Sequence, residues 1–84
     1  PAPGGPVRIS IPLQESGQIR VTAFTVTGEL VWKTQFRGDV GQNTLVWDVT
    51  NLAGENLSSG IYLIVIDIQT GSEHAIQTLR LVVL

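Results

Sequence analysis

The fold is decided by the stretch Leu45-Val-Trp-Asp-Val-Thr-Asn-Leu-Ala-Gly-Glu-Asn-Leu-Ser-Ser-Gly-Ile-Tyr62. Two apolar segments, each with an aromatic residue, flank a polar loop that carries Gly54 and Gly60. The segment that follows the loop, residues 61–69, is apolar on both of its alternating faces, which is typical of a strand in the middle of a sheet. The stretch therefore predicts two β-strands joined by a long loop.

The rest of the chain also alternates between apolar and polar residues, and no segment has helical periodicity. The strands that this pattern predicts are 7–13, 18–26, 29–36, 44–49, 61–69 and 74–83. We therefore expect an all-β fold, an immunoglobulin-like antiparallel β-sandwich of about six to seven strands, with a Greek-key barrel as the alternative. Pro12 cannot donate a backbone hydrogen bond, so the first strand is predicted to lie at an edge.

Two hairpins fix the expected register. A two-residue turn at Thr27-Gly28 places Ala23 opposite Trp32, with Leu30 on the same inner face. The pair Gly71-Ser72 predicts a second two-residue turn, of type II′ because glycine comes first.

The second hairpin brings the last strand beside residues 61–69. This register sets Gln77 opposite Ile66, where it is the lone polar residue on an otherwise apolar inner face. Residues 1–6, which are rich in proline and glycine, are predicted to be a linker, and residues 7–84 a single Ig-like domain.

Composition excludes several function classes. The chain has 84 residues, of which 43% are apolar and 14% charged, with a net charge of −2, so it is one globular domain. Its five basic residues are scattered, which argues against nucleic-acid binding and against polybasic attraction to a membrane. Without cysteine there is no disulfide or thiolate metal site. The longest apolar run, residues 61–66, is too short for membrane insertion.

Several motifs match a family pattern. They are Ile19-Arg-Val-Thr-Ala-Phe-Thr-Val-Thr-Gly-Glu-Leu-Val31, Trp47-Asp48, Asn51, Gly54 and Leu57-Ser-Ser-Gly-Ile-Tyr62. On these residues the chain resembles the Ig-like C-terminal modules of bacterial secreted proteins. One such group is the Ig-like domain of the flagellar hook-capping protein, and the other is the type IX secretion C-terminal sorting domain.

The chain departs from that pattern at four places. Pro3-Gly-Gly-Pro6 stands where the family often has Pro-Asn-Pro, and Thr25 stands where an acidic residue is common. Val49 follows Trp-Asp, where the family often has glycine. Arg80 replaces a lysine that sorting domains commonly carry near the final strand, and the sequence ends on Leu84.

The resemblance implies a non-catalytic module at the C-terminal end of a bacterial secreted or cell-surface protein. Its implied role is secretion sorting, attachment or packing against neighbouring domains or the secretion and surface machinery, outside the cell. Two alternatives stay open: a carbohydrate-binding accessory module of a secreted glycan-active enzyme, and a structural assembly module. No set of residues predicts catalysis, a cofactor or a metal site, so we do not expect an enzyme.

Polar candidates have simpler interpretations. His74 is the only histidine and has no nucleophile motif near it, so we interpret it as a solvated hairpin residue. Asp48, Asn51, Glu55 and Asn56 offer oxygen ligands for calcium within one loop, but with only two carboxylates. We expect Asp48 and Asn51 to accept hydrogen bonds from backbone amides of their own loop.

Two further features concern recognition. Arg37-Gly38-Asp39 spells an integrin-recognition tripeptide in a predicted exposed loop, and we interpret it as turn chemistry. Trp32, Trp47 and Tyr62 are predicted to face the core. Phe24 is predicted to face outward, as a contact for a neighbouring domain or as part of a surface for weak carbohydrate contact.

Overall fold

The computed structural model describes residues 6–84, whose regular structure consists of β-strands. The strands are β1 (Val7–Leu13), β2 (Gly17–Thr25), β3 (Leu30–Gly38), β4 (Gly41–Trp47), β5 (Gly60–Thr70) and β6 (His74–Val83). The prediction of an all-β fold is confirmed. The predicted linker at residues 1–6 lies outside the described residues, apart from Pro6.

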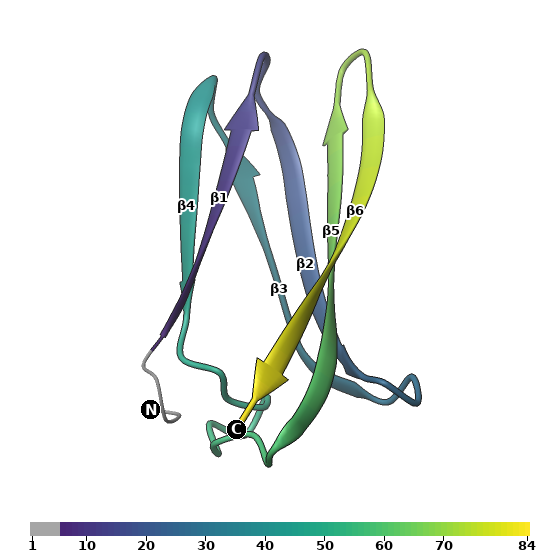
Figure 1. Ribbon diagram of the computed structural model, residues 1–84. Coiled ribbons are helices and arrows are strands. Elements are labelled where there is room, and N and C mark those ends of the chain that lie inside the picture. Colours follow the sequence, from purple (N-terminus) through teal and green to yellow (C-terminus); the bar gives the residue numbers. More distant parts are fainter. Residues whose placement is uncertain (1–5) are drawn as a thin grey trace.

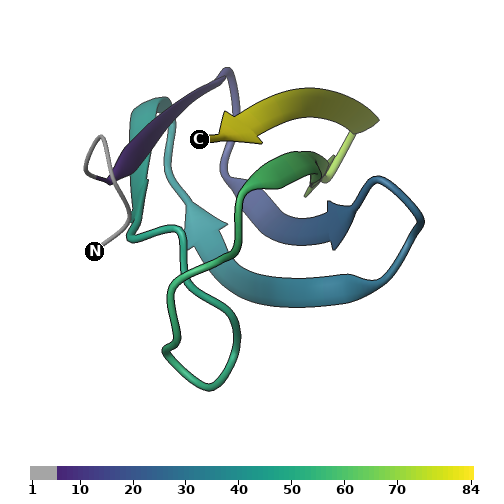
Figure 2. The same cartoon turned by 60° about the horizontal axis from the view of Figure 1, so that its bottom comes forward.

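The strands form two antiparallel sheets, one with the order β1-β4 and one with the order β3-β2-β5-β6. Within residues 6–84 no ladder joins the two sheets, so the fold is a sandwich and not a barrel. The start of β1, the end of β6 and the long β4–β5 loop lie at one end of the molecule (Figure 1). Figure 2 shows the four-stranded sheet curving around the β1–β4 pair.

Two predictions about strand position are confirmed. β5 lies inside the four-stranded sheet, between β2 and β6, as its two apolar faces predicted. β1 pairs with β4 alone among the described strands, so Pro12 stands on an edge strand.

The core lies between the two sheets. It is built by alternate residues of each strand, because successive side chains of a strand point to opposite faces. Its buried apolar members are Ile9, Ile11, Leu13, Ile19, Val21, Ala23, Trp47, Val49, Tyr62, Ile64, Ile66 and Val83. Trp32 of β3 stacks on Trp47 of β4 with ring centroids 4.9 Å apart, which ties the two sheets together on one side.

The β2–β3 turn differs from the prediction. It has three residues, because the Thr25 N–H donates to the Glu29 carbonyl and the Gly28 N–H to the Thr25 carbonyl. Gly28 has φ 96°, the left-handed conformation that closes such a turn and that glycine adopts without strain.

A β-bulge restores the predicted register. The longer turn pairs Phe24 with Leu30, but the register shifts by one residue before Ala23, which pairs with Trp32 as predicted. The position of Leu30 on the inner face was therefore wrong: Leu30 lies opposite Phe24, and 42% of its surface is exposed.

The β5–β6 hairpin has the predicted register, with Gln77 opposite Ile66. The predicted type II′ turn is wrong, because Gly71 does not have the positive φ that this turn requires. The turn is held instead by Thr70, whose N–H donates to the Glu73 carbonyl and whose hydroxyl accepts from the Glu73 N–H.

Val49 has an unusual backbone for a β-branched residue. Its φ is 58°, in the left-handed region, while its side chain is buried with 3% exposed. The chain leaves β4 here, and the Val49 carbonyl accepts from the Leu57 N–H across the loop. Glycine adopts this conformation without strain, whereas a β-branched residue does not.

We expect Val49→Gly to be more stable than Val49→Ala. Both variants lose the buried side chain, but alanine keeps the steric conflict of a left-handed conformation, which costs about 1–2 kcal/mol. Glycine avoids this steric conflict, but its greater conformational freedom in the unfolded chain lowers its stability by about 0.5–1 kcal/mol. Urea denaturation of the two variants measures the difference.

The control is buried Val21, in the middle of β2, where the order is expected to reverse. There alanine should be more stable than glycine, because the backbone is extended. The same order at both positions would contradict the strain at Val49.

Candidate functional site

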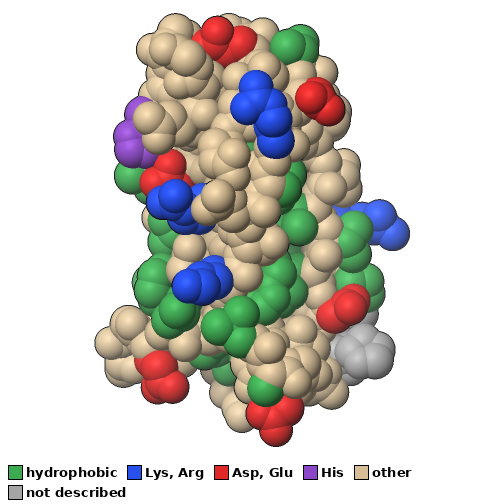
Figure 3. Space-filling view, turned by 180° about the vertical axis from the view of Figure 1, so that it is seen from behind, with side chains coloured by type: hydrophobic (Ala, Val, Ile, Leu, Met, Phe, Trp, Pro, Cys, Tyr) green, Lys and Arg blue, Asp and Glu red, His purple; other side chains and the backbone are tan. Residues whose placement is uncertain are grey.

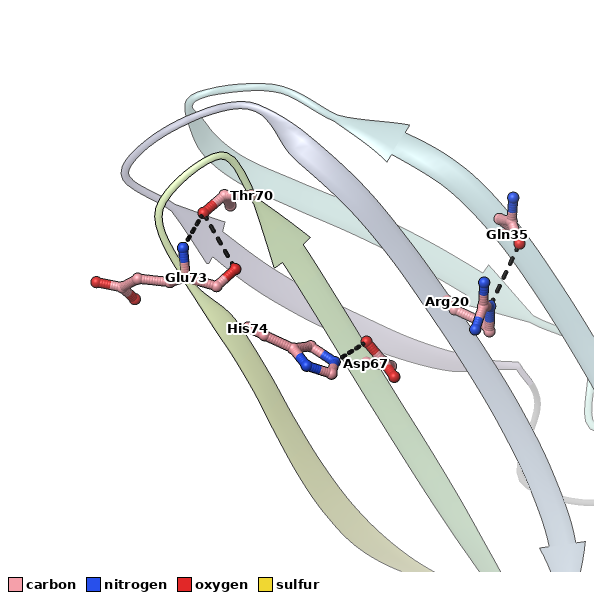
Figure 4. A network of polar contacts seen from close by, with 6 residues as sticks. All are labelled: Arg20, Gln35, Asp67, Thr70, Glu73 and His74. Carbon is pink, nitrogen blue, oxygen red and sulfur yellow. Dashed lines mark hydrogen bonds and ion pairs between the residues drawn. The ribbon is translucent and has the colours of Figure 1, made fainter.

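The titratable side chains do not converge. Within residues 6–84, no three His, Asp or Glu side chains lie together in a way that could hold a metal ion. The predicted solvated position of His74 is observed: 53% of its side chain is exposed, and its Nε2 lies 2.8 Å from the Asp67 carboxylate (Figure 4). Sequence analysis missed Asp67, because the two residues meet diagonally across β5 and β6. We interpret this pair as a surface contact, which is worth little in water.

The loop after β4 is organised by Asn51. Its Oδ1 accepts from the Ala53 and Glu55 N–H groups at 2.9 and 3.0 Å, and its Nδ2 donates to the Glu55 carboxylate. The predicted role of Asn51 is therefore confirmed. The same prediction was wrong for Asp48, which is exposed and has no hydrogen bond to the described residues. Both polar atoms of the Asn51 side chain are thus used to hold the loop.

The tripeptide Arg37-Gly38-Asp39 does not lie in an exposed loop, so that expectation was wrong. Arg37 and Gly38 belong to β3, and Gly38 is buried. A Cβ on Gly38 would lie 2.6 Å from Cδ1 of Ile19 and 2.7 Å from Cδ1 of Leu13. A methyl group here would have to displace the ends of these two core side chains, so core packing favours glycine. The tripeptide is explained by the crossing from one sheet to the other.

Glu15 joins two turns at one end of the sandwich (Figure 1). From the β1–β2 turn, its Oε1 accepts from the Thr70 hydroxyl at 2.7 Å and from the Ser72 N–H and hydroxyl in the β5–β6 turn. The Ser72 hydroxyl, then the Thr70 hydroxyl and the Ser72 N–H, hold the pKa of this carboxyl below its ordinary value of 4.5. This contact positions the hairpin.

The aromatic side chains are used inside the fold. Trp47 is 2% exposed, stacks on Trp32 and donates its indole N–H to the Thr50 carbonyl at 3.1 Å. Tyr62 is 6% exposed and donates its hydroxyl to the Ser58 carbonyl at 2.6 Å. Phe24 is half-buried on the outer face. The core positions predicted for Trp47 and Tyr62 are confirmed. No row of exposed aromatic rings is present among residues 6–84 for stacking on a sugar.

An apolar surface covers the outer face of the four-stranded sheet. Val82 lies opposite Ile61, and Phe24 lies opposite Leu63. We call the set formed by Phe24, Ile61, Leu63, Val65 and Val82 the outer patch. Figure 3 views this face and shows hydrophobic side chains gathered there with Lys and Arg among them. The structure offers this surface, and not a cluster of reactive groups, as its candidate functional site.

Comparison with known proteins identifies the fold. No protein-family model and no curated protein matches the sequence. Among solved structures, FlgD from P. aeruginosa matches over 89% of this chain with a TM-score of 0.71 and 18% identity. FlgD from Xanthomonas campestris, whose description refers to hook capping as essential for flagellar assembly, matches over 94% with a TM-score of 0.68 and 20% identity. This chain has the fold found in FlgD.

The likeness has a clear extent. The chain spans less than three fifths of the two FlgD structures, 59% and 57% of their lengths. It therefore matches a part of each, and the fold likeness agrees with the resemblance to the hook-capping Ig-like domain. Residues 6–84 contain no helix with the length and apolar character needed to cross a membrane.

We expect Gly38→Ala to destabilise the protein by about 1–3 kcal/mol, because the added methyl group overpacks the core against Ile19 and Leu13. Gly71→Ala is the matched control: its Cβ would meet nothing within 4 Å and its φ is not left-handed, so its effect should be near zero. Urea denaturation compares the two variants. Equal stabilities would show that Gly38 is not held by packing.

We expect Glu15→Gln to reduce stability at neutral pH and to have a smaller effect in acid. The hydrogen bonds favour the charged carboxylate, so its folded-state pKa is lowered. The stabilisation is therefore present above pH 4.5, the ordinary value, and is lost as the pH falls through the lower folded-state pKa. Urea denaturation of the wild type and the variant over a pH series measures this difference.

Ser72→Ala provides the control, because it removes the hydroxyl that contributes most to the lowered pKa. In that background the effect of Glu15→Gln should shrink. A difference between wild type and Glu15→Gln that stays constant from neutral to acid pH would rule out this role of the carboxylate.

Proposed function

We propose that residues 7–84 form a non-catalytic assembly module, which holds its parent protein in a larger structure by packing the outer patch against another protein. The observation that carries the proposal is the composition of β5. The fold uses Tyr62, Ile64 and Ile66 in the core, where 2–6% of each residue is exposed. It does not use the apolar residues that alternate with them, which point to the other face.

Those alternating residues have no layer over them among the described residues. Ile61 is 41% exposed and its cross-strand neighbour Val82 is 53% exposed, while Leu63 and Val65 are half-buried. A sandwich of this type needs a polar outer face for solubility, and antiparallel sheets normally alternate in that way. A contiguous apolar surface on such a face is typical of a protein–protein contact.

The fold likeness supports the same class of function. The Xanthomonas protein is described as a hook-capping protein in flagellar assembly, which is a structural role. Because the match is at 20% identity, it gives the fold, and the function of this chain rests on its own surface. Attachment or packing at the end of a bacterial secreted or surface protein fits this proposal. Secretion sorting stays a prediction from the resemblance.

Carbohydrate binding is less well supported. It needs aromatic rings presented together to solvent, and both tryptophans and the tyrosine of this chain are engaged with the core or with loop carbonyls. Phe24 alone remains on the outer face, within an apolar surface. This arrangement favours contact with a protein.

The test is to replace the two most exposed β5–β6 members of the outer patch in the full-length parent protein. The double variant Ile61→Thr/Val82→Thr keeps β-branched residues suited to strands but removes apolar surface. We expect the cross-linked assembly recovered from cells to fall by roughly tenfold, which corresponds to about 1.4 kcal/mol of binding free energy. Quantitative cross-linking and mass spectrometry measure the yield.

Val46→Thr is the matched control, because Val46 is 46% exposed on the outer face of the other sheet. It should leave the assembly intact. If the double variant assembles as well as the wild type, the outer patch is not the docking surface. A catalytic activity of residues 7–84 that alanine substitution of His74 or of the acidic residues removes would overturn the non-catalytic assignment.

A further inference from the structure

One face of β6 should be buried in a sandwich but is not. Ile64 and Ile66 on the inner face of β5 are 2% and 3% exposed. Their cross-strand neighbours on β6, Leu79 and Gln77, share that face, yet Leu79 is 36% exposed and Gln77 is also exposed. The inner surface of the four-stranded sheet therefore continues beyond the part that the other sheet covers.

The cause is the unequal size of the two sheets. The sheet formed by β1 and β4 has two strands, and it leaves β6 without a strand above it. The result is a groove of about 410 Å³ that is lined by residues of β1, β5 and β6. We call it the β1–β6 groove; its lining includes Ile9, Ile11, Ile66, Gln77, Leu79 and Leu81.

The edge of β1 on the side of the groove is able to pair with a further strand. The Ile11 carbonyl accepts from the side chain of Asn43, its partner on β4, so it is directed toward β4. Alternation along an antiparallel strand then directs the backbone groups of Arg8 and Ser10 away from β4. No described strand pairs with that edge. Unpaired edges are templates for strand addition.

We propose that the β1–β6 groove binds an extended, acidic segment of another protein, which adds to β1 as a third strand of the smaller sheet. The inward side chains of the added strand are apolar and cover Leu79, Leu81 and Ile66. The outward side chains lie beside Arg8 and Ser10, which also point outward. The alternation requires an apolar residue at every second position and favours a carboxylate next to Arg8.

The charge of the groove selects an acidic segment. Arg8 lies on the β1 edge that lines the groove, and the lining contains no carboxylate, although the chain as a whole has seven acidic residues and a net charge of −2. Arg80 also belongs to the lining, but it lies opposite Leu63, so its side chain is on the outer face of β6. Six of those acidic residues lie between strands, and the seventh, Asp67, lies in β5, which is interior to its sheet.

The same distribution argues against a second copy as the occupant. The edge strands β1, β3, β4 and β6 carry Arg8, Lys33, Arg37 and Arg80 but no acidic residue. Pairing two copies through their edges would bring basic strands together or leave these arginines without a carboxylate. Residues 1–6 contain no acidic residue either. Residues 1–84 therefore do not supply the required segment, and we assign it to a partner protein.

The experiment uses a synthetic peptide of about seven residues, the length of a typical strand, in which valine alternates with aspartate and threonine. A matched peptide has lysine in place of aspartate. We expect the acidic peptide to bind the wild-type chain at least tenfold more tightly than the basic one, measured by calorimetry. Amide protection of Arg8 and Ser10 in hydrogen exchange should rise on binding.

Two lysine variants on one strand locate the site. Gln77→Lys places a charge on the inner face of β6, where the apolar inward side chains of the peptide would bury it without a carboxylate partner, and should weaken peptide binding at least tenfold. Thr78→Lys adds the same charge one residue along, on the outer face of the same strand, and should bind the peptide like the wild type or slightly better. Both positions are exposed, so both variants should fold, which circular dichroism checks.

Several outcomes would overturn the proposal. These are the absence of peptide binding at about 1 mM, equal loss of binding in the two lysine variants, and tighter binding of the basic peptide. A dimer of the chain in sedimentation that Gln77→Lys abolishes would assign the groove to a second copy. The proposal shares with the assembly function only the premise that the module binds protein. Ile61→Thr/Val82→Thr should leave peptide affinity unchanged, so the failure of one proposal is distinguishable from that of the other.

Discussion

The packing of Trp47 holds the two sheets together, and the rest of the structure depends on it. A two-stranded sheet has little stability of its own in water, and β1 and β4 are not even consecutive in the chain. Trp47 anchors this pair by stacking on Trp32 of the larger sheet. Its indole N–H also fixes the start of the long loop through the Thr50 carbonyl. One buried side chain thus joins both sheets and the loop.

The loop has a second anchor at its far end. Tyr62 is buried at the start of β5 and donates its hydroxyl to the Ser58 carbonyl. Between the two aromatic anchors, the Asn51 side chain accepts hydrogen bonds from backbone N–H groups of the turn. Val49 has a strained, left-handed φ where the chain turns away from β4. Both tryptophans and the tyrosine are therefore committed to holding the chain in place. What remains for function is surface.

That surface follows from the difference between the two sheets. Four strands face two, so the inner side of β6 and one edge of β1 are left uncovered, while the outer side of β5 carries apolar residues that the core does not use. Both features concern binding by shape and backbone pairing. Neither gathers the converging titratable groups that chemistry requires. The fold is the one found in FlgD, and the function of this chain rests on its own surfaces.

Sequence alone determined the fold class, the strands and much of the register, because side-chain alternation is a local property that a sandwich preserves. It placed Gln77 opposite Ile66 and Ala23 opposite Trp32. The second pairing was correct because two unpredicted features cancel: the turn is one residue longer than expected, and a β-bulge shifts the register back by one residue. Only the tertiary structure decided that Gly38 is enclosed by core side chains, that Val49 is left-handed and that β6 has an uncovered inner face. These depend on how many strands each sheet receives and on where they cross. Hydrophobic alternation says which face of a strand is apolar, but it does not say whether another strand will lie above it.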